Sequence, residues 1–377
     1  MLVAKPANCT VRRMLRGDET QARRRTGVLL MAVVGALAAG LVLLGNPGNM
    51  GLCGACFARD VAGSLGLHQG PSILRPEVPG VVLGALVFCL ASGRHVGRSG
   101  SNAVARFLLG VAMAVGALVF LGCPFRLFQR LGGGDLNAWL ALPGFALGVR
   151  IAMGFEARGY SIGKTHEVPL GVGLMGPVAC IGVLVLFLVG GVLDGPGPGV
   201  AGPPGHATWL WALAISGVAG AILSATGFCG ISAMRRVFNG NRAMLSAAAA
   251  MIAAYAVVAL LGGRFSLSFD APIAHGVWGW NLLGLMLVGL CGALCGGCPV
   301  RLIVLTGEGN GDAFVGLMGL VVGGALAHTL GLAAAPAIGD AVGGPAFAGR
   351  VAVVCLLVLV LLYAFAMRRP SAGSSAA

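Results

Sequence analysis

Long apolar stretches alternate with short polar or glycine-rich segments along most of the chain. A membrane-spanning helix needs about 20 predominantly apolar residues, and ten stretches approach or reach that length. They lie near 27–45, 78–92, 104–122, 136–153, 171–193, 208–226, 243–262, 278–295, 313–333 and 348–367. The pattern therefore predicts an all-α integral membrane protein with about ten transmembrane helices.

Four shorter segments lie between these stretches, and each carries a cysteine. They are 48–66, 123–133, 227–240 and 298–310. Each is too short or too rich in glycine to cross a bilayer. Because irregular backbone is tolerated at membrane depth only where protein or a water-filled cavity surrounds it, we expect four short re-entrant half-helices.

Two cysteine motifs occur once in each half of the chain, in the same order. Each combines a cysteine with a nearby glycine and a following arginine. Gly51-Leu52-Cys53-Gly54 with Arg59 returns as Gly227-Phe228-Cys229-Gly230 with Arg235, and Gly122-Cys123-Pro124-Phe125-Arg126-Leu127 returns as Gly297-Cys298-Pro299-Val300-Arg301-Leu302. The two offsets are 176 and 175 residues. A nearly constant offset indicates a duplicated unit, which in transporters places one shared site between the halves.

Each half holds five predicted spans, an odd number, so the second half enters the membrane from the opposite side. The sequence thus predicts two inverted-topology repeats. We divide the chain into a basic cytoplasmic tail (1–26), a first repeat (27–193), a Gly/Pro-rich periplasmic linker (194–207), a second repeat (208–367) and a cytoplasmic tail (368–377). We expect the first apolar stretch to be an uncleaved helix, since the repeat needs it.

Composition and charge agree with a membrane protein. Hydrophobic residues make up 57% of the chain and charged residues 10%, whereas soluble domains carry about 25% charged residues. The net charge of +13 comes from basic residues spread over short loops, so nucleic acid is not an expected partner. Six arginines precede the first span and the linker has no Lys or Arg, which places both termini in the cytoplasm.

The chain has 11 cysteines, and they fall into different classes. Cys89, Cys180, Cys291 and Cys355 lie inside apolar spans, where we expect small buried hydrophobic side chains. The four repeated cysteines, Cys53, Cys123, Cys229 and Cys298, each begin a re-entrant segment. A helix N-terminus offers free N–H donors and a partial positive charge, and it attracts anions. Four such termini would form an anion-binding constriction lined by sulfur, although helix breaking with cysteine as filler stays an alternative.

Two further cysteines, Cys56 and Cys295, form C-x-x-C spacings with Cys53 and Cys298. Their repeat positions hold Ser232 and Phe120, so the spacings are not symmetric. We therefore expect no zinc site, and a redox-active dithiol stays open.

Arginines recur with the cysteine motifs, and arginine close to the hydrocarbon region is costly unless it has a function. Arg59, Arg126, Arg235 and Arg301 could bind an anion in transit. Alternatively, they pair with Asp60, Asp135, Glu308 or Asp312, or extend to the interface. His275 and His328 are expected to be packing groups. The chain has no credible P-loop, dinucleotide fingerprint or catalytic triad, so we expect no resident cofactor or metal and no enzymatic activity.

At these motifs the chain resembles the YeeE/YedE family of membrane proteins with a sulfur-transport domain, and most closely the YedE-type selenium transporters. The resemblance covers nearly all of 27–367. It is carried by Gly45–Cys53 with Ala55–Phe57 and Arg59-Asp60, by Gly122–Pro124, Gly132–Ala138 and Gly159–Gly163, and by Ala271–His275, Gly296–Pro299 with Arg301, and Gly307–Gly309.

The resemblance implies import of a small selenium or sulfur compound across a bacterial inner membrane, with a selenium compound favoured and a thiosulfate-like anion next. It places the substrate path at Cys53, Cys123 and Cys298, followed by Cys229. A soluble sulfurtransferase-like carrier on the cytoplasmic side is an expected partner. Two departures, Gly227 in place of arginine and Arg236 in place of an aspartate, affect the surroundings of Cys229.

Two other functions stay open at this point. One is a membrane-bound thiol/disulfide or sulfurtransferase-type enzyme that uses a C-x-x-C pair. The other is a membrane dock for a soluble sulfur carrier.

Overall fold

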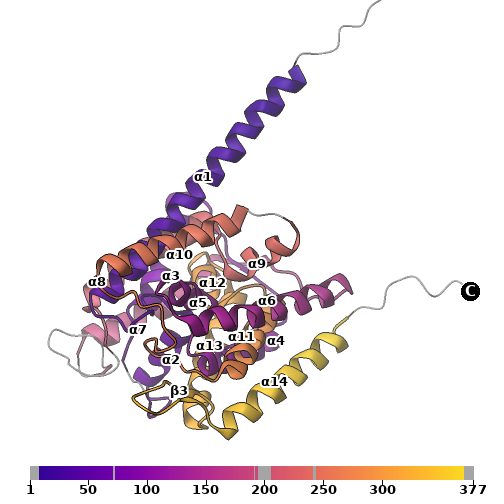
Figure 1. Ribbon diagram of the computed structural model, residues 1–377. Helices are drawn as coiled ribbons and strands as arrows, with labels where there is room; N and C mark the ends of the chain where they lie inside the picture. Colours follow the sequence, from indigo (N-terminus) through magenta and orange to yellow (C-terminus); the bar gives the residue numbers. More distant parts are fainter. Residues whose placement is uncertain (1–7, 71–72, 191, 194–204, 241–242, 369–377) are drawn as a thin grey trace, which may run out of the picture.

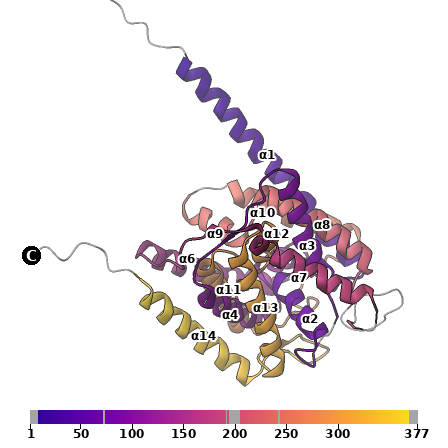
Figure 2. The ribbon, with the colours of Figure 1, turned by 180° about the vertical axis from the view of Figure 1, so that it is seen from behind.

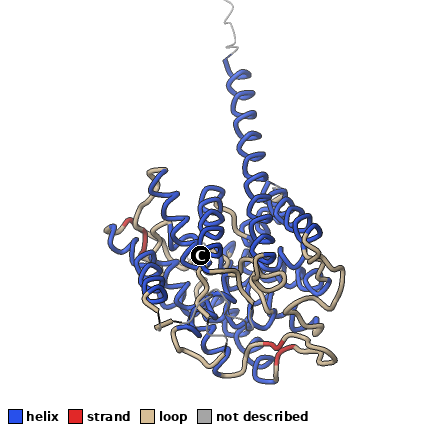
Figure 3. The backbone as a smooth tube through the Cα atoms, turned by 90° about the vertical axis from the view of Figure 1, so that its left-hand side faces the viewer, coloured by secondary structure: helices blue, strands red, loops and turns tan. Residues whose placement is uncertain are grey.

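The computed structural model describes residues 8–70, 73–190, 192–193, 205–240 and 243–368, with side chains for all of these except 8–23 and 243. This part of the chain is mostly helical, with two small antiparallel strand pairs (Figures 1 and 3). The all-α fold class is therefore confirmed. Most of the predicted linker, at 194–204, and the end of the C-terminal tail, at 369–377, lie outside the described residues.

The first half contains seven helices within the described residues. They are α1 Asn8–Leu43, α2 Gly54–Ser64, α3 Glu77–Ala91, α4 Ala103–Phe120, α5 Pro124–Gly132, α6 Leu136–Ala157 and α7 Leu170–Leu188. The second half follows the same series of long and short helices. They are α8 Trp209–Thr226, α9 Gly230–Phe238, α10 Ala243–Leu261, α11 Trp278–Cys295, α12 Pro299–Gly307, α13 Gly311–Thr329 and α14 Phe347–Ala366.

Every predicted apolar stretch is a helix, and every predicted short segment contains a short helix. Among the described residues, nine helical stretches are long and apolar enough to cross a membrane. Three of the nine join a long helix to the short helix after it, at 103–132, 209–238 and 278–307. Helix α3 is apolar but has only 15 residues. These helices indicate a multi-pass membrane protein.

Two small strand pairs mark opposite ends of the molecule. Strand β1 (Arg98–Ser99) pairs with β2 (His166–Glu167), and Arg98 also bridges to Asn310. We call this the β1 end; the α9 and α12 helices finish there. Strand β3 (Ala334–Ala335) pairs with β4 (Gly344–Pro345). At this β3 end the turn after α5 meets the loop that follows α10, since Asp135 bridges to Ser268.

The main helix contacts between the halves have counterparts that join the equivalent helices of the opposite halves. Helix α3 packs on α8 as α10 packs on α1, and α6 packs on α11 as α13 packs on α4. The α4–α11 contact lies at the centre of this pattern (Figures 1 and 2). The duplicated sequence thus folds into two interlocked halves rather than two separate domains.

Glycines allow these helices to approach closely. A Cβ atom built on Gly84 of α3 would lie 1.9 Å from the Gly217 carbonyl oxygen of α8, and one on Gly144 of α6 would lie 2.1 Å from the Leu282 carbonyl oxygen of α11. Neither distance is possible for a real side chain. Small residues at helix contacts are typical of membrane proteins, where packing rather than the hydrophobic effect drives association.

The outer helices present apolar side chains outward. Large exposed hydrophobic side chains on α14 include Val358, Leu359, Leu362 and Phe365. Cys355 lies on the same helix and is exposed, so the prediction that it is buried was wrong. Helix α14 lies along one edge of the bundle, where it packs on α11 and α4 (Figure 1). Cys89, Cys180 and Cys291 are buried, as predicted.

Substituting one glycine at the α6–α11 contact tests this packing. We expect Gly144→Ala to destabilise the protein by about 1–3 kcal/mol, because the added methyl group overpacks the contact. Gly154→Ala, two turns or more along the same helix, meets nothing within 4 Å and is expected to be neutral or slightly stabilising. Thermal melting of the two purified variants in detergent measures the difference, and equal melting temperatures would contradict the helix contact.

Candidate functional site

Each short helix begins directly after one of the four repeated cysteines. Cys53, Cys123, Cys229 and Cys298 are the N-cap residues of α2, α5, α9 and α12, all with extended backbone. Pro124 and Pro299 occupy the first turn of α5 and α12, where proline loses no helical hydrogen bond. The prediction that each repeated cysteine stands at the start of a short segment is therefore confirmed.

The sulfur atoms lie beside the free amides of the first turns. The Cys56 N–H donates to the Cys53 sulfur at 3.4 Å. The Cys123 and Cys298 sulfurs lie near the amides of Arg126 and Arg301, and the Cys229 sulfur lies near those of α9. Because the first four N–H groups of a helix have no partner within the helix, each thiol stands where an anion would also be favoured.

The four cysteines form two adjacent pairs. The side chains of Cys53 and Cys123 lie close enough to interact, and so do those of Cys229 and Cys298. Each pair joins the two short helices of one half. Cys298 also interacts electrostatically with Cys123, so the two pairs are neighbours. All four side chains are at most 3% exposed.

A glycine after the cysteine brings the short helices of opposite halves together. A Cβ atom on Gly54 would lie 2.7 Å from the Pro299 carbonyl carbon at the start of α12, and one on Gly230 would lie 3.4 Å from the Pro124 Cβ atom at the start of α5. The N-terminus of α2 thus meets that of α12, and α9 meets α5. Four helix N-termini from both halves converge on the cysteines.

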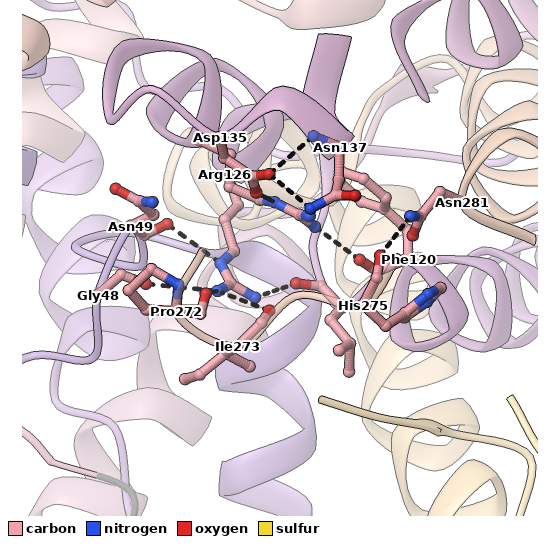
Figure 4. A network of polar contacts seen from close by, with 12 residues as sticks. Gly48, Asn49, Phe120, Arg126, Asp135, Asn137, Pro272, Ile273, His275 and Asn281 are labelled. Carbon is pink, nitrogen blue, oxygen red and sulfur yellow. Dashed lines mark hydrogen bonds and ion pairs between the residues drawn. The ribbon is translucent and has the colours of Figure 1, made fainter. Parts of the chain in front are cut away.

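Arg126 is fully buried beside the first cysteine pair and contacts backbone carbonyl groups (Figure 4). Its Nε donates to the Asn49 oxygen at 3.1 Å, and its NH2 group donates to the Gly48, Pro272 and Ile273 oxygens at 3.3–3.4 Å. NH1 donates to the Leu121 oxygen. Within the described residues no carboxylate forms an ion pair with Arg126. Its charge is thus met only by partial charges, which leaves this side of the site positive.

Arg301, the repeat counterpart of Arg126, has a different partner. Its NH1 and NH2 groups donate to the two Glu308 carboxylate oxygens at 2.9 and 3.1 Å. In both motifs the arginine stem folds over the preceding glycine, since a Cβ atom on Gly122 or Gly297 would lie 3.0 or 3.3 Å from it. The glycine of the Gly-Cys-Pro motif therefore makes room for the arginine.

Arg59 shares one carboxylate with a second arginine. Its Nε donates to Asp60 at 2.7 Å, and the Nε of Arg75 donates to the other Asp60 oxygen at 2.7 Å. Asp60 and Arg75 are both fully buried. The buried carboxyl group of Glu77 also interacts electrostatically with Arg75, so these two guanidinium groups face two carboxyl groups.

Arg235 is neutralised from outside its own motif. Its NH1 and NH2 groups donate to Glu156, at the end of α6, at 2.7 and 2.6 Å. Sequence reasoning missed Glu156 because it lies in neither repeat motif; its only signal was a lone carboxylate in the last turn of an apolar helix. Arg236 is exposed. Gly227 has φ +60° at the C-cap of α8, a conformation that favours glycine over arginine.

The two C-x-x-C spacings differ in geometry. The Cys56 side chain lies close enough to that of Cys53 to interact with it. Cys295 instead lies beside Arg106, whose NH1 group donates to the Cys295 carbonyl oxygen at 2.8 Å. Only the first spacing therefore brings its two thiols together as a candidate dithiol.

Arg130, Asp312 and His275 each have a structural partner. Arg130, rather than Arg126, pairs with Asp135 at 2.5 Å, and Asp312 pairs with Arg106 at 3.8 Å. His275 is buried between the Val119 carbonyl oxygen at 2.8 Å and the Val277 amide at 3.3 Å. Burial lowers the pKa of His275, and these two contacts fit the neutral ring.

His328 stacks on His68 with ring centroids 4.9 Å apart. The contact fits the packing role predicted for His328. It joins the end of α13 to the loop after α2, at the β3 end of the molecule.

Two cavities flank the short helices at the β1 end. One, of about 460 Å³, contains the Arg235–Glu156 pair and reaches Ser232 and Gly296, next to the second cysteine pair. The other, of about 380 Å³, contains the Arg301–Glu308 pair. Each cavity is therefore lined by an ion pair between an arginine of a cysteine-capped helix and a glutamate.

Within the described residues, no group of three or more His, Cys, Asp or Glu side chains is placed to hold a metal ion. Comparison with known proteins gives no relative: no protein-family model matches the chain, and no curated protein matches it.

Mild oxidation tests the pairing of the cysteines. We expect a disulfide between Cys229 and Cys298, because their side chains interact, and none between Cys295 and Cys298, because Cys295 lies beside Arg106. Peptide mass spectrometry after treatment with copper-phenanthroline identifies the linked cysteines, and Cys229→Ser should remove the first product. A Cys295–Cys298 disulfide in the wild-type protein would show that the second pair is placed incorrectly.

Proposed function

We propose that this protein imports a small selenium- or sulfur-containing anion across a bacterial inner membrane, in the manner implied by its resemblance to the YeeE/YedE family. A selenium compound is the favoured cargo and thiosulfate the next. One observation carries the proposal: four cysteine-capped helix N-termini, two from each half, converge at one buried place. That arrangement combines positive potential with soft sulfur donors, and both suit a chalcogen-containing anion.

The proposed orientation is an inverted repeat with both termini in the cytoplasm. Helices α2 and α5 re-enter from the β3 end and α9 and α12 from the β1 end. Basic loop residues concentrate at the β1 end. They are Arg94, Arg98, Arg158, Lys164, Arg236 and Arg368. By the positive-inside rule this end is cytoplasmic, and the β3 end is periplasmic.

The proposed mechanism is stepwise transfer of the anion between thiols. The uncompensated charge of Arg126 and the N-termini of α2 and α5 draw the anion to Cys53 and Cys123. The S–H groups donate hydrogen bonds to it, and it then passes to Cys298 and Cys229. Binding at each step must be weak enough for release, as in channel filters. Because the thiols are at most 3% exposed, short-helix or side-chain movement must open the path.

One observation favours a second candidate, a membrane-bound thiol enzyme. Cys53 and Cys56 lie within reach at the start of a helix, the arrangement that C-x-x-C oxidoreductases use. The enzyme would cycle between dithiol and disulfide at this pair, without moving an anion through the protein.

Uptake by purified protein in liposomes tests the import proposal. Labelled selenite and thiosulfate are offered separately to the wild type and to Cys53→Ala, Cys123→Ala and Cys298→Ala. We expect each substitution to lower uptake about tenfold or more, because each removes a hydrogen bond to a charged group. Cys355→Ala, at an exposed position, should transport normally. Normal uptake by the three variants would exclude transfer between these thiols.

The same assay separates the alternatives. Cys56→Ser should keep most of the uptake if the protein is an importer, whereas a dithiol enzyme would lose its activity. Cys295→Ser is the matched control, since Cys295 lies beside Arg106. If flux appears only when a soluble sulfur carrier is added, the protein acts as a dock for that carrier instead.

A further inference from the structure

A polar cavity of about 380 Å³ lies beside α12 at the β1 end. Its polar lining consists of Cys89, Arg94, Arg98, Ser224, Arg301, Glu308 and Asn310. The lining residues come from the end of α3, the loop before β1, the end of α8 and one face of α12. The cavity is large enough for a small oxyanion with part of its hydration shell.

The charges around this cavity do not balance. Three guanidinium groups face one carboxylate, which leaves a surplus of two positive charges. Glu308 pairs with Arg301, whereas Arg94 and Arg98 form no ion pair within the described residues. Glu167 stands opposite Arg98 in the β1–β2 register but does not come within ion-pair distance. A dianion in the cavity would neutralise the surplus.

Glu308 already occupies the position that an oxyanion would take. Its two oxygens accept from both terminal nitrogens of Arg301, and one of them also accepts from the Ser224 hydroxyl at 2.9 Å. Sulfate-like oxyanions bind arginine through the same two-oxygen geometry. The Glu308 side chain is 20% exposed, so water reaches the pair and a competing anion can too.

The first half lacks this carboxylate. The positions that match Glu308 by the two repeat offsets are Gly132 and Gly133, and Arg126 is held by carbonyl groups alone. The arginine of the motif therefore needs no carboxylate to be accommodated. Glu308 is an addition specific to the second half.

The cavity also lies on the line of α12. Arg301, Leu305 and Glu308 share one face of this helix, spaced by four and three residues, and the helix begins at Cys298. An anion that leaves the cysteine caps along α12 would meet the cavity next.

We propose that this cavity binds a small dianionic oxyanion and that Glu308 exchanges with that anion on Arg301. The anion displaces the carboxylate, binds Arg301, Arg94, Arg98 and the Ser224 hydroxyl, and leaves when Glu308 returns. A role of the cavity in anion release rests on the proposed function. Anion binding to the cavity does not, because binding requires no transport.

Equilibrium binding of sulfate and of thiosulfate to the purified full-length protein tests the site. Isothermal titration calorimetry at low ionic strength compares the wild type with Glu308→Gln, which keeps the side-chain shape and removes the competing charge. We expect Glu308→Gln to lower the dissociation constant about tenfold for both anions, because Arg301 is free to bind them. Arg94→Gln combined with Arg98→Gln, both at exposed positions, should raise the wild-type dissociation constant by about the same factor.

Glu156→Gln is the matched control. It removes one negative charge and frees Arg235, but in a cavity that has no other arginine. Equal tightening by Glu156→Gln and Glu308→Gln would overturn the proposal, because the effect would then follow net charge alone. Unchanged binding in both Glu308→Gln and the double arginine variant would overturn it too.

The anion-site proposal and the import proposal can be refuted separately. If the cysteine variants transport normally but Glu308→Gln binds sulfate more tightly, the anion site stands and the thiol pathway falls. If uptake depends on the cysteines but Glu308→Gln leaves sulfate binding unchanged, the thiol pathway stands and the anion site falls.

Discussion

Four helices that begin inside the protein set the main physical constraint on this structure. The first-turn amides of α2, α5, α9 and α12 have no partner within their own helices, and they lie together at the crossing of the two halves. A thiol accepts such hydrogen bonds only weakly. The cysteine caps therefore leave a positive potential that an anion can use, and they do so without a fixed negative charge that would exclude it.

The arginines of the cysteine motifs have different partners in the two halves. In the first half, Arg126 is held by carbonyl oxygens, and Arg59 and Arg75 share Asp60. In the second half, Arg235 and Arg301 each have a carboxylate of their own, from Glu156 and Glu308. Among the arginines of the cysteine motifs, Arg126 therefore has no carboxylate partner in the described part of the chain, whereas Arg235 and Arg301 are each paired. In the proposed import, Arg126 would attract the anion on entry and Glu308 would compete with it on exit.

Much of this could be predicted from sequence, because the relevant signals are local. Apolar length located the ten helices to within a few residues at most ends, although α1 begins well before its apolar stretch, at Asn8. Glycine and proline around Cys123 and Cys298 located the helix starts. The count of spans was less certain, since α3 has only 15 residues.

The partners of the charged groups could not be predicted, because they depend on tertiary contacts. Glu156 lies 79 residues from Arg235 in sequence. Asp135 was a candidate partner for the arginines of the cysteine motifs, but it pairs with Arg130. The prediction that Cys355 is buried was wrong for a similar reason, because the sequence of an apolar helix does not reveal which of its faces contacts protein. The family resemblance and the cargo it implies stay predictions.

Locating the anion directly would test the central claim, that the four cysteine caps form one binding place. Anomalous diffraction at the selenium absorption edge, from crystals soaked in selenite, gives the position of the selenium atom without assuming a mechanism. The account predicts a peak among the sulfur atoms of Cys53, Cys123, Cys229 and Cys298. Selenium bound only elsewhere, for instance at the exposed Cys355, would contradict it.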